Sequence, residues 1–207
     1  MSQAKEQLDL EVYGKIGTGR PSPNGEYQPT ITYKGRLKQS IEFVAAKSID
    51  IRRKEEAYNL FNFIKSNSHP HIVKFYGWYQ TDHHFWFILE YCPGGTLLEL
   101  IEQDVRLPEP IIRIFASDII DALLFLHKKG VILRDMQPRN ILIDECGSLK
   151  IGDFTKAASL DKPTPLSFNN TFTDRDMVEY LAPELLIDTS TASFASDLWS
   201  LGVLMYR

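Results

Sequence analysis

One stretch constrains this chain more than any other: residues 134–140, with the sequence RDMQPRN. It places the carboxylate of Asp135 five residues ahead of Asn140, and Pro138 stiffens the turn between them. Asp153 follows eighteen residues after Asp135, beside a phenylalanine. Phosphoryl transfer needs a group that holds the attacking hydroxyl and oxygen ligands that hold a metal on the nucleotide phosphates. Asp135 fits the first role, and Asn140 and Asp153 fit the second. Either feature alone, the stretch 134–140 or Asp153 with its neighbouring phenylalanine, would also suit a polar loop in an ordinary α/β domain.

The composition narrows the class of protein. Of the 207 residues, 43% are hydrophobic and 24% are charged, and the formal net charge is −4. This balance is typical of a globular protein and argues against nucleic-acid or membrane partners. No apolar run reaches the ~20 residues of a membrane span. Cys92 and Cys146 lie far apart without a CxxC pattern, which suits a reducing, cytoplasmic compartment.

Hydrophobic periodicity divides the chain into a strand-rich and a helical half. Apolar–polar alternation predicts an antiparallel sheet of five strands, at residues 10–16, 30–37, 41–49, 73–80 and 85–91. Helical spacing predicts helices at residues 53–65, 96–101 and 109–129. Short strands are expected on either side of the polar loop, at 141–144 and 149–151. Residues 92–95 (CPGG) form the expected seam, and clefts between lobes commonly bind ligands.

Several motifs in this order resemble those of protein kinases. Residues 134–140 resemble the catalytic loop H-R-D-L-x-x-x-N, residues 153–155 resemble D-F-G, and residues 44–47 resemble V-A-I-K. Further on, residues 182–184 match A-P-E, and residues 197–202 resemble the D-x-W-S-x-G of the central C-lobe helix.

The resemblance implies an α+β, two-lobed fold. Residues 1–9 would be a tail, residues 10–91 an N-lobe with a five-stranded antiparallel sheet and one helix, and residues 92–207 a helical C-lobe. Because the chain ends at Arg207, inside the helix with the D-x-W-S-x-G motif, we expect that C-lobe to be incomplete. The implied activity is transfer of a phosphoryl group from ATP, with Mg²⁺, to a serine or threonine of a protein substrate.

The resemblance also implies a role for particular residues. Asp135 would be the catalytic base, assisted by Lys47 and Asn140, and Asn140 and Asp153 would be the metal ligands. The residues implied to bind the nucleotide are Ile16, Gly17, Gly19, Ala45, Lys47, Glu90, Cys92, Leu142 and Asp153.

The nucleotide side departs from the kinase pattern in two places. Gly17 and Gly19 match the glycine-rich loop, but Thr30 stands at the third glycine position after a long segment with three prolines. That segment is either a surface insertion or an altered phosphate lid. Leu60 stands where the family has a glutamate that pairs with Lys47. Glu55 and Glu56 lie about one turn earlier, so either the helix register differs and one of them takes that place, or the usual glutamate partner is missing. An ungapped count favours the missing partner.

The substrate side departs in a connected way. Gln137 stands where serine/threonine kinases have a lysine, so a cation near the transferred phosphoryl group is lost. Met177 stands where the family has a threonine that contacts the same lysine and the catalytic aspartate. Thr155 replaces the glycine of D-F-G, which reduces backbone freedom but leaves the metal ligand intact.

Residues 75–81 and 89–97 resemble the Fused and Unc-51-like group of serine/threonine kinases, particularly a pseudokinase-leaning member associated with cilia and microtubules. Two functions therefore stay open. The first is a protein serine/threonine kinase, of weak activity, that acts on a protein substrate. The second is a pseudokinase, a scaffold or interaction module with ATP as a structural ligand. The resemblance implies ciliary or microtubule-associated partners and a location in the cytoplasm, cilium or cytoskeleton.

Overall fold

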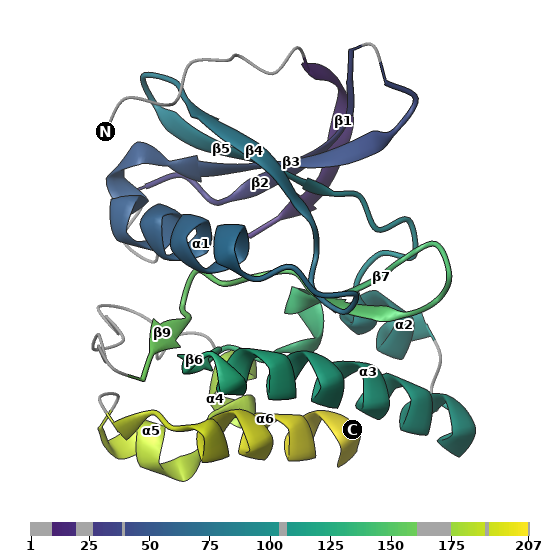
Figure 1. Cartoon of the computed structure of the whole chain (residues 1–207), viewed down its shortest axis with the longest axis vertical. Coiled ribbons are helices and arrows are strands. Elements are labelled where there is room, and N and C mark those ends of the chain that lie inside the picture. The colour runs from purple at the N-terminus through teal and green to yellow at the C-terminus, as the bar shows by residue number, and fades with distance from the viewer. Residues whose placement is uncertain are drawn as a thin grey trace. The chain divides into compact units, whose positions relative to one another are not determined.

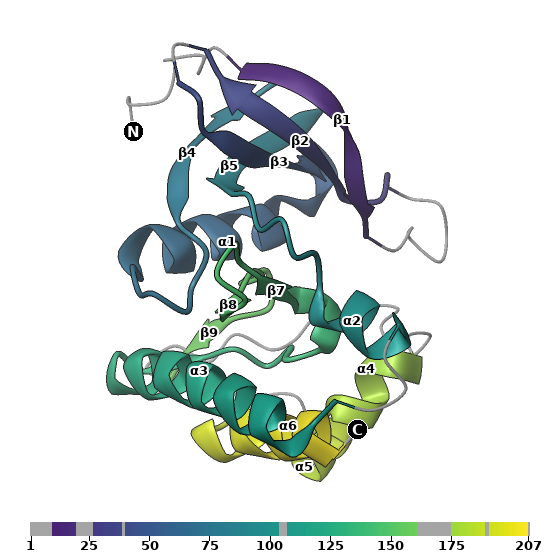
Figure 2. The same ribbon diagram turned by 90° about the vertical axis from the view of Figure 1, so that its right-hand side faces the viewer.

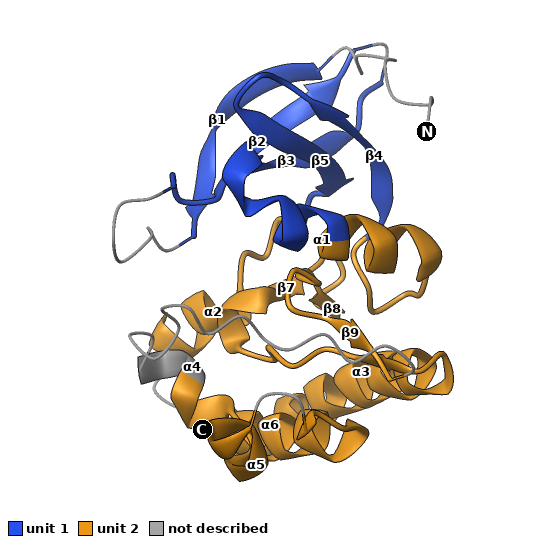
Figure 3. Cartoon of the chain, turned by 90° about the vertical axis from the view of Figure 1, so that its left-hand side faces the viewer, with its two compact units in different colours: residues 1–58, 74–91 blue, residues 59–73, 92–207 orange. Residues whose placement is uncertain are grey.

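The computed structural model describes residues 10–19, 27–38, 40–103, 107–160, 175–188 and 191–206, without the side chains of 175–177. The chain divides into two compact units (Figure 3). The first contains Met1–Tyr58 and Lys74–Tyr91, and the second contains Asn59–Val73 and Cys92–Arg207. The boundaries expected from the sequence, with one lobe over residues 10–91, stay a prediction.

The first unit is built on one antiparallel sheet with the strand order β1-β2-β3-β5-β4 (Figure 1). This confirms the α+β fold and the five-stranded antiparallel sheet expected from the alternating pattern. The strands are β1 (Leu10–Thr18), β2 (Ile31–Leu37), β3 (Phe43–Asp50), β4 (Phe75–Gln80) and β5 (His84–Glu90).

Strand β3 is the middle strand of the sheet, and six of its eight residues are buried, more than in any other strand of the sheet. Val44 and Ala46 of β3 and Ile88 of β5 are fully buried and form a core under the sheet. Partly buried side chains cover that core, among them Tyr79 and Trp86, whose rings stack 5.9 Å apart. Apolar burial of this kind is the main source of stability in a small sheet.

Asp50 ends strand β3 and begins the helical segment that follows. That segment consists of the 3-10 turn η1 (Ile51–Arg53) and helix α1 (Lys54–Ser66). The buried carboxylate of Asp50 accepts hydrogen bonds from the backbone N–H of Gln28 and of Arg52, each at 2.9 Å. The side chain of Arg52 donates as well, and this bond above all holds the pKa of Asp50 well below its usual range. Asp50 therefore ties the segment before β2 to the start of the helical segment.

The second unit combines helices with two short strand pairs. Strand β6 (Val131–Ile132) pairs with β9 (Ala158–Ser159), and β7 (Ile141–Ile143) pairs with β8 (Leu149–Ile151). The remaining elements are α2 (Leu97–Gln103), α3 (Glu109–Lys128), η2 (Pro138–Asn140), α4 (Arg175–Tyr180), α5 (Pro183–Ile187) and α6 (Phe194–Tyr206). The helices α3 and α6 lie side by side (Figure 2).

Helix α3 is the central helix of this unit and presents one apolar face to its core. The buried residues of that face are Phe115, Ile119, Ala122, Leu123 and Leu126, at the helical spacing seen in the sequence. Within the described part of the chain, no helix is both long and apolar enough to cross a membrane.

The segment after helix α1 contacts strand β8 of the second unit. Val73 donates its backbone N–H to the carbonyl of Ile151 at 3.1 Å, and Ile151 donates to the carbonyl of His71 at 2.9 Å. The end of α1 and the segment up to Val73 therefore group with the second unit.

We expect Asp50→Asn to lower the free energy of unfolding by about 1–3 kcal/mol at pH 7, because an amide cannot accept all of these hydrogen bonds. The folded-state pKa of Asp50 is depressed. Its contribution is therefore complete above the unfolded-state pKa of about 4 and is lost as the pH falls below it.

Urea denaturation at pH 7 and at about pH 3 measures both effects, with a narrower gap between wild type and variant at the lower pH. Glu109→Gln is the matched control, because Glu109 also pairs with an arginine, at 2.7 Å, but is 74% exposed. Such an exposed pair contributes no more than about 0.5 kcal/mol. Equal losses in both variants would show that the burial of Asp50 is unimportant.

Candidate functional site

A buried carboxylate on helix α6 fixes the backbone of the loop that the sequence singles out. Asp197, 1% exposed, accepts hydrogen bonds from the backbone N–H of Leu133 at 3.0 Å and of Arg134 at 2.9 Å. The ring of His127 on α3 lies 2.9 Å from the same carboxylate through Nε2. Arg134 has a φ of 63°, a left-handed conformation that costs a non-glycine residue energy. The two hydrogen bonds that Leu133 and Arg134 donate to Asp197 hold the chain in this conformation, immediately before Asp135.

Arg134 connects this loop to the segment after Asp153. Its side chain is buried, and burial lowers the pKa of the guanidinium to about 10, although the negative charge of Asp197 opposes that shift. Arg134 therefore stays charged at neutral pH. Its Nε donates to the main-chain carbonyl of Lys156 at 2.7 Å. A buried cation thus joins the loop of Asp135 to the segment that contains Lys156.

Backbone and side-chain hydrogen bonds bring three predicted site residues into one network. Asn140 donates from Nδ2 to the main-chain carbonyl of Asp135 at 3.0 Å. Its own carbonyl accepts from the N–H of Gly152 at 2.9 Å, directly before Asp153. Because Nδ2 is used in this way, Oδ1 is the atom of the Asn140 amide that a metal could bind.

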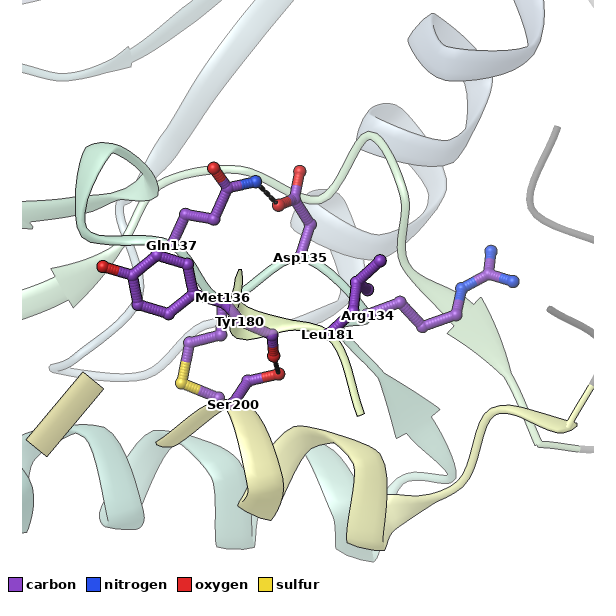
Figure 4. A pocket seen from close by; sticks show the side chains of 7 residues that line it. All are labelled: Arg134, Asp135, Met136, Gln137, Tyr180, Leu181 and Ser200. Carbon is purple, nitrogen blue, oxygen red and sulfur yellow. Dashed lines mark hydrogen bonds between the residues drawn. The ribbon is translucent and has the colours of Figure 1, made fainter. Parts of the chain in front are cut away.

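The carboxylate of Asp135 contacts two side chains of the second unit. Gln137 donates a hydrogen bond from Nε2 to Oδ1 of Asp135 (Figure 4). Lys156 lies with Nζ 3.3 Å from Oδ2. Arg134 extends away from this carboxylate (Figure 4). A carboxylate has about four lone-pair positions, so these two contacts leave acceptor capacity for a substrate hydroxyl.

Lys156 is the residue that sequence reasoning missed. It follows the D-F-G-like motif, where a lysine in the sequence gives no signal beyond that of an ordinary surface side chain. Its side chain is 25% exposed, and that of Asp135 is 13% exposed. The pair is therefore partly shielded from water, which strengthens its electrostatic attraction.

The segment that contains Asp153 is tightly packed. Its Oδ1 accepts from the N–H of Thr155 at 2.9 Å, and the intervening Phe154 is fully buried. A Cβ on Gly152 would lie 2.9 Å from Cδ1 of Leu142, so a larger residue at this position would have to displace that side chain. Thr155, which replaces a glycine in the kinase pattern, is accommodated with 8% exposure.

The donor set fits a magnesium ion that also binds phosphate. Mg²⁺ is usually held by one or two carboxylates together with substrate phosphates and waters. Asp153 and Asn140 offer one carboxylate and one amide oxygen. Among the described residues, no group of three or more His, Cys, Asp or Glu side chains forms a metal site by protein ligands alone.

In the first unit, the predicted nucleotide residues of β1 and β3 lie in register across the sheet. Gly17 pairs with Thr32, Thr32 pairs with Lys47, and Lys47 pairs with Phe87, so these four form one row. Ala45 lies two residues before Lys47 on β3, and Ile16 precedes Gly17 on β1. The sheet thus brings the strand lysine and the first glycine of the altered loop onto the same row.

The base of the altered glycine loop is closed by a backbone contact. Gly19 donates its N–H to the carbonyl of Thr30 at 2.6 Å, one step beyond the paired strands. A Cβ on Gly19 would lie 3.2 Å from the Cβ of Thr30, so a small residue is favoured here. Residues 20–26 of the long segment lie outside the described residues, as do the side chain of Met177 and the tail over residues 1–9.

Two further predicted nucleotide residues flank the end of β5. In the first unit, Glu90 accepts from the N–H of Lys74 at 3.0 Å through Oε2. In the second unit, Cys92 is buried and its carbonyl accepts from Gly95 at 3.3 Å.

The structure also places the residues at issue in helix α1. Leu60, at the position expected to hold a glutamate, is fully buried. Glu56, the alternative partner considered for Lys47, accepts a hydrogen bond from Nε of Arg53 at 2.9 Å through Oε1. Arg53 also donates to Thr30 at 2.7 Å. Glu56 thus has a cationic partner of its own within the first unit.

Comparison with known proteins gives the family. The model of the protein kinase domain matches residues 11–207. The chain is 43% identical, over 95% of its length, to serine/threonine-protein kinase RUNKEL of Arabidopsis thaliana, and covers 14% of that protein. It is 34% identical over 95% of its length to serine/threonine-protein kinase ULK4 of Mus musculus, and covers 16% of it. The chain belongs to the protein kinase family. Members of this family use ATP and a divalent metal and act on protein substrates.

We expect Asp197→Asn to lower the free energy of unfolding by about 2–3 kcal/mol. An amide has one acceptor oxygen, so one backbone donor at Leu133 or Arg134 would face an NH₂ group. Chemical denaturation measures the loss. Asp121→Asn, on the exposed side of α3, is the control and should change stability by less than about 0.5 kcal/mol. A loss no larger than that of the control would show that Asp197 does not fix the loop.

Proposed function

We propose that this chain transfers the γ-phosphoryl group of ATP to a serine or threonine hydroxyl of a protein. One observation supports this proposal above all. Asp135 and Asn140 are joined at 3.0 Å in a loop that Asp197 fixes, and Asn140 leads directly to Asp153 through Gly152. The names of the relatives, serine/threonine-protein kinases, agree with it.

In this proposal Asp135 accepts the proton of the substrate hydroxyl. The hydroxyl oxygen forms a bond to the γ-phosphorus, and the bond from that phosphorus to the β–γ bridging oxygen breaks. The products are the phosphorylated protein, ADP and a proton, which Asp135 releases to solvent. Holding the hydroxyl in line with the phosphorus supplies most of the catalysis, because this reaction depends on positioning and charge stabilisation.

Asn140 and Asp153 would bind Mg²⁺, which neutralises charge on the ATP phosphates when it is bound. On the side of the first unit, Lys47 would bind the α- and β-phosphates, with Gly17 and Gly19 beneath them. The other nucleotide contacts that we propose are with Ile16, Ala45, Glu90, Cys92 and Leu142. The lobe boundaries at residues 10–91 and 92–207 belong to the same proposal.

We further infer membership of the Fused and Unc-51-like group. The 34% identity to ULK4 supports it, although RUNKEL is more similar, at 43%. Ciliary or microtubule-associated partners, and a location in the cytoplasm, cilium or cytoskeleton, rest on that resemblance alone. The chain covers 14% and 16% of these two relatives, so their partners and activities concern proteins with much additional sequence.

One observation favours a second function, that of a pseudokinase scaffold which binds ATP without transferring phosphate. Leu60 is fully buried where kinases place a glutamate, and Glu56 is bonded to Arg53. A kinase without the usual lysine–glutamate pair positions the α- and β-phosphates less firmly. Retention of Asp135, Asn140 and Asp153 is the argument against it.

Thermal denaturation with nucleotide tests the metal-binding part of the proposal. We expect ATP to raise the melting temperature more with Mg²⁺ than with EDTA, and Asp153→Ala to remove that difference. Glu102→Gln, an exposed carboxylate on α2, should leave it unchanged. Equal stabilisation by ATP in EDTA would contradict the metal ligands. Transfer of labelled phosphate to the chain or to serine and threonine peptides, lost in Asp135→Asn, separates the kinase from the scaffold.

A further inference from the structure

The catalytic-loop position that supplies a lysine in serine/threonine kinases contains Gln137 in this chain. Gln137 contacts Asp135, but a neutral amide contributes no positive charge. Its Oε1 is buried and has no hydrogen-bond partner among the described residues. Gln137 therefore positions the carboxylate but cannot stabilise the negative charge of a phosphoryl group during transfer.

Lys156 places a positive charge at the same carboxylate from a different segment. Its Nζ lies 3.3 Å from Oδ2 of Asp135, whereas Gln137 contacts Oδ1. A single lysine at position 137 would both contact Asp135 and supply a positive charge. Here Gln137 supplies only a contact, and Lys156 supplies the charge. Arg134 does not compete for this role, because its guanidinium is buried and its Nε donates to the main chain of Lys156.

The backbone around Lys156 is held on both sides, so the point at which its side chain begins is fixed. The carbonyl of Lys156 accepts from Arg134 at 2.7 Å, and that of Thr155 accepts from Nδ2 of Asn59 at 3.2 Å. Ala157 donates its N–H to the carbonyl of Phe154 at 3.1 Å. Lys156 is the only residue from 154 to 158 that is not buried. The fold therefore exposes this one side chain beside Asp135.

We propose that Lys156 is a catalytic residue that replaces the missing lysine at position 137. Its ammonium group lies 3.3 Å from Asp135, beside the position of the attacking hydroxyl, and in the transition state it would donate to an oxygen of the transferred phosphoryl group. A positive charge that is fixed before the reaction stabilises the charge that develops there. This inference rests on the proposed phosphotransfer, and it predicts that a lysine can be moved between positions 156 and 137.

The test compares Lys156→Met, Lys156→Arg, Gln137→Lys and the double variant Lys156→Met with Gln137→Lys. We expect Lys156→Met to reduce kcat by at least about tenfold, as removal of one transition-state donor does elsewhere. Lys156→Arg should keep most of the rate, and Gln137→Lys should restore most of it in the Lys156→Met background.

Binding provides a readout that does not depend on turnover. Calorimetry with ATP and with ADP should show a preference for ATP that falls by at least about threefold in Lys156→Met, since only ATP offers a γ-phosphate. The double variant should recover it. Lys128→Met, an exposed lysine on α3, makes the same change in charge and should alter neither kcat nor this preference. Melting temperatures without nucleotide identify any variant that fails to fold.

Three results would overturn the proposal: no change in Lys156→Met, a rise in kcat, which would make the contact inhibitory, or a fall that Gln137→Lys does not restore. If the wild-type chain transfers no phosphate, the proposed function fails, and the ATP preference then decides the role of Lys156. A preference that Lys156→Met leaves intact would reject that role by itself.

Discussion

The candidate site depends on the buried carboxylate of Asp197. Two consecutive backbone N–H groups donate to it, and this arrangement needs the left-handed conformation of Arg134. Such a conformation costs an L-residue roughly 1–2 kcal/mol and persists only where surrounding contacts over-determine it. The two hydrogen bonds to a charged acceptor, with His127 on the same carboxylate, offset that cost. Asp135 follows directly, so helix α6 sets its position.

A second buried charge extends this control to another segment. The side chain of Arg134 is buried, and its Nε donates to the carbonyl of Lys156. The negative charge of Asp197 favours the charged form of Arg134, and this opposes the lowering of the pKa of Arg134 by burial. Removing either charge would leave the other without compensation, the costly case for buried ions. The loop and the turn after Asp153 are therefore positioned together, although they lie far apart in the sequence.

The elements that sequence predicted well are those whose signal is local. Alternation of apolar residues indicated the five strands, because each strand has a face that must be buried. The spacing of Asp135, Asn140 and Asp153 also indicated a site, which stays a prediction, and the structure joins Asp135 to Asn140 by a hydrogen bond. Contacts at long range could not be predicted in this way. Asp50 looks like any acidic residue at a strand end until Gln28, 22 residues earlier, donates to it.

Lys156 shows the same limit at the site itself. Because glutamine stands at position 137, the sequence pattern predicts that the cation near the transferred phosphoryl group is lost. The charge is nevertheless within 3.3 Å of Asp135, because the backbone of residues 153–157 turns toward the loop. A residue pattern records which side chain stands at a position, whereas electrostatic stabilisation depends only on where the charge lies in space.

Lys156 and Asp135 belong to different segments of the chain. A lysine at position 137 would be fixed to the same loop as Asp135. Lys156 instead belongs to the turn that begins with Asp153, so the proposed metal ligand and the cation share one backbone segment. Any displacement of that turn removes both charges from the loop at once. Arg134 is the link that opposes such a displacement, since it bonds the turn to the backbone that Asp197 holds. In this chain, the proposed binding of the metal and the proposed charge stabilisation at Asp135 would therefore be coupled through the buried guanidinium of Arg134.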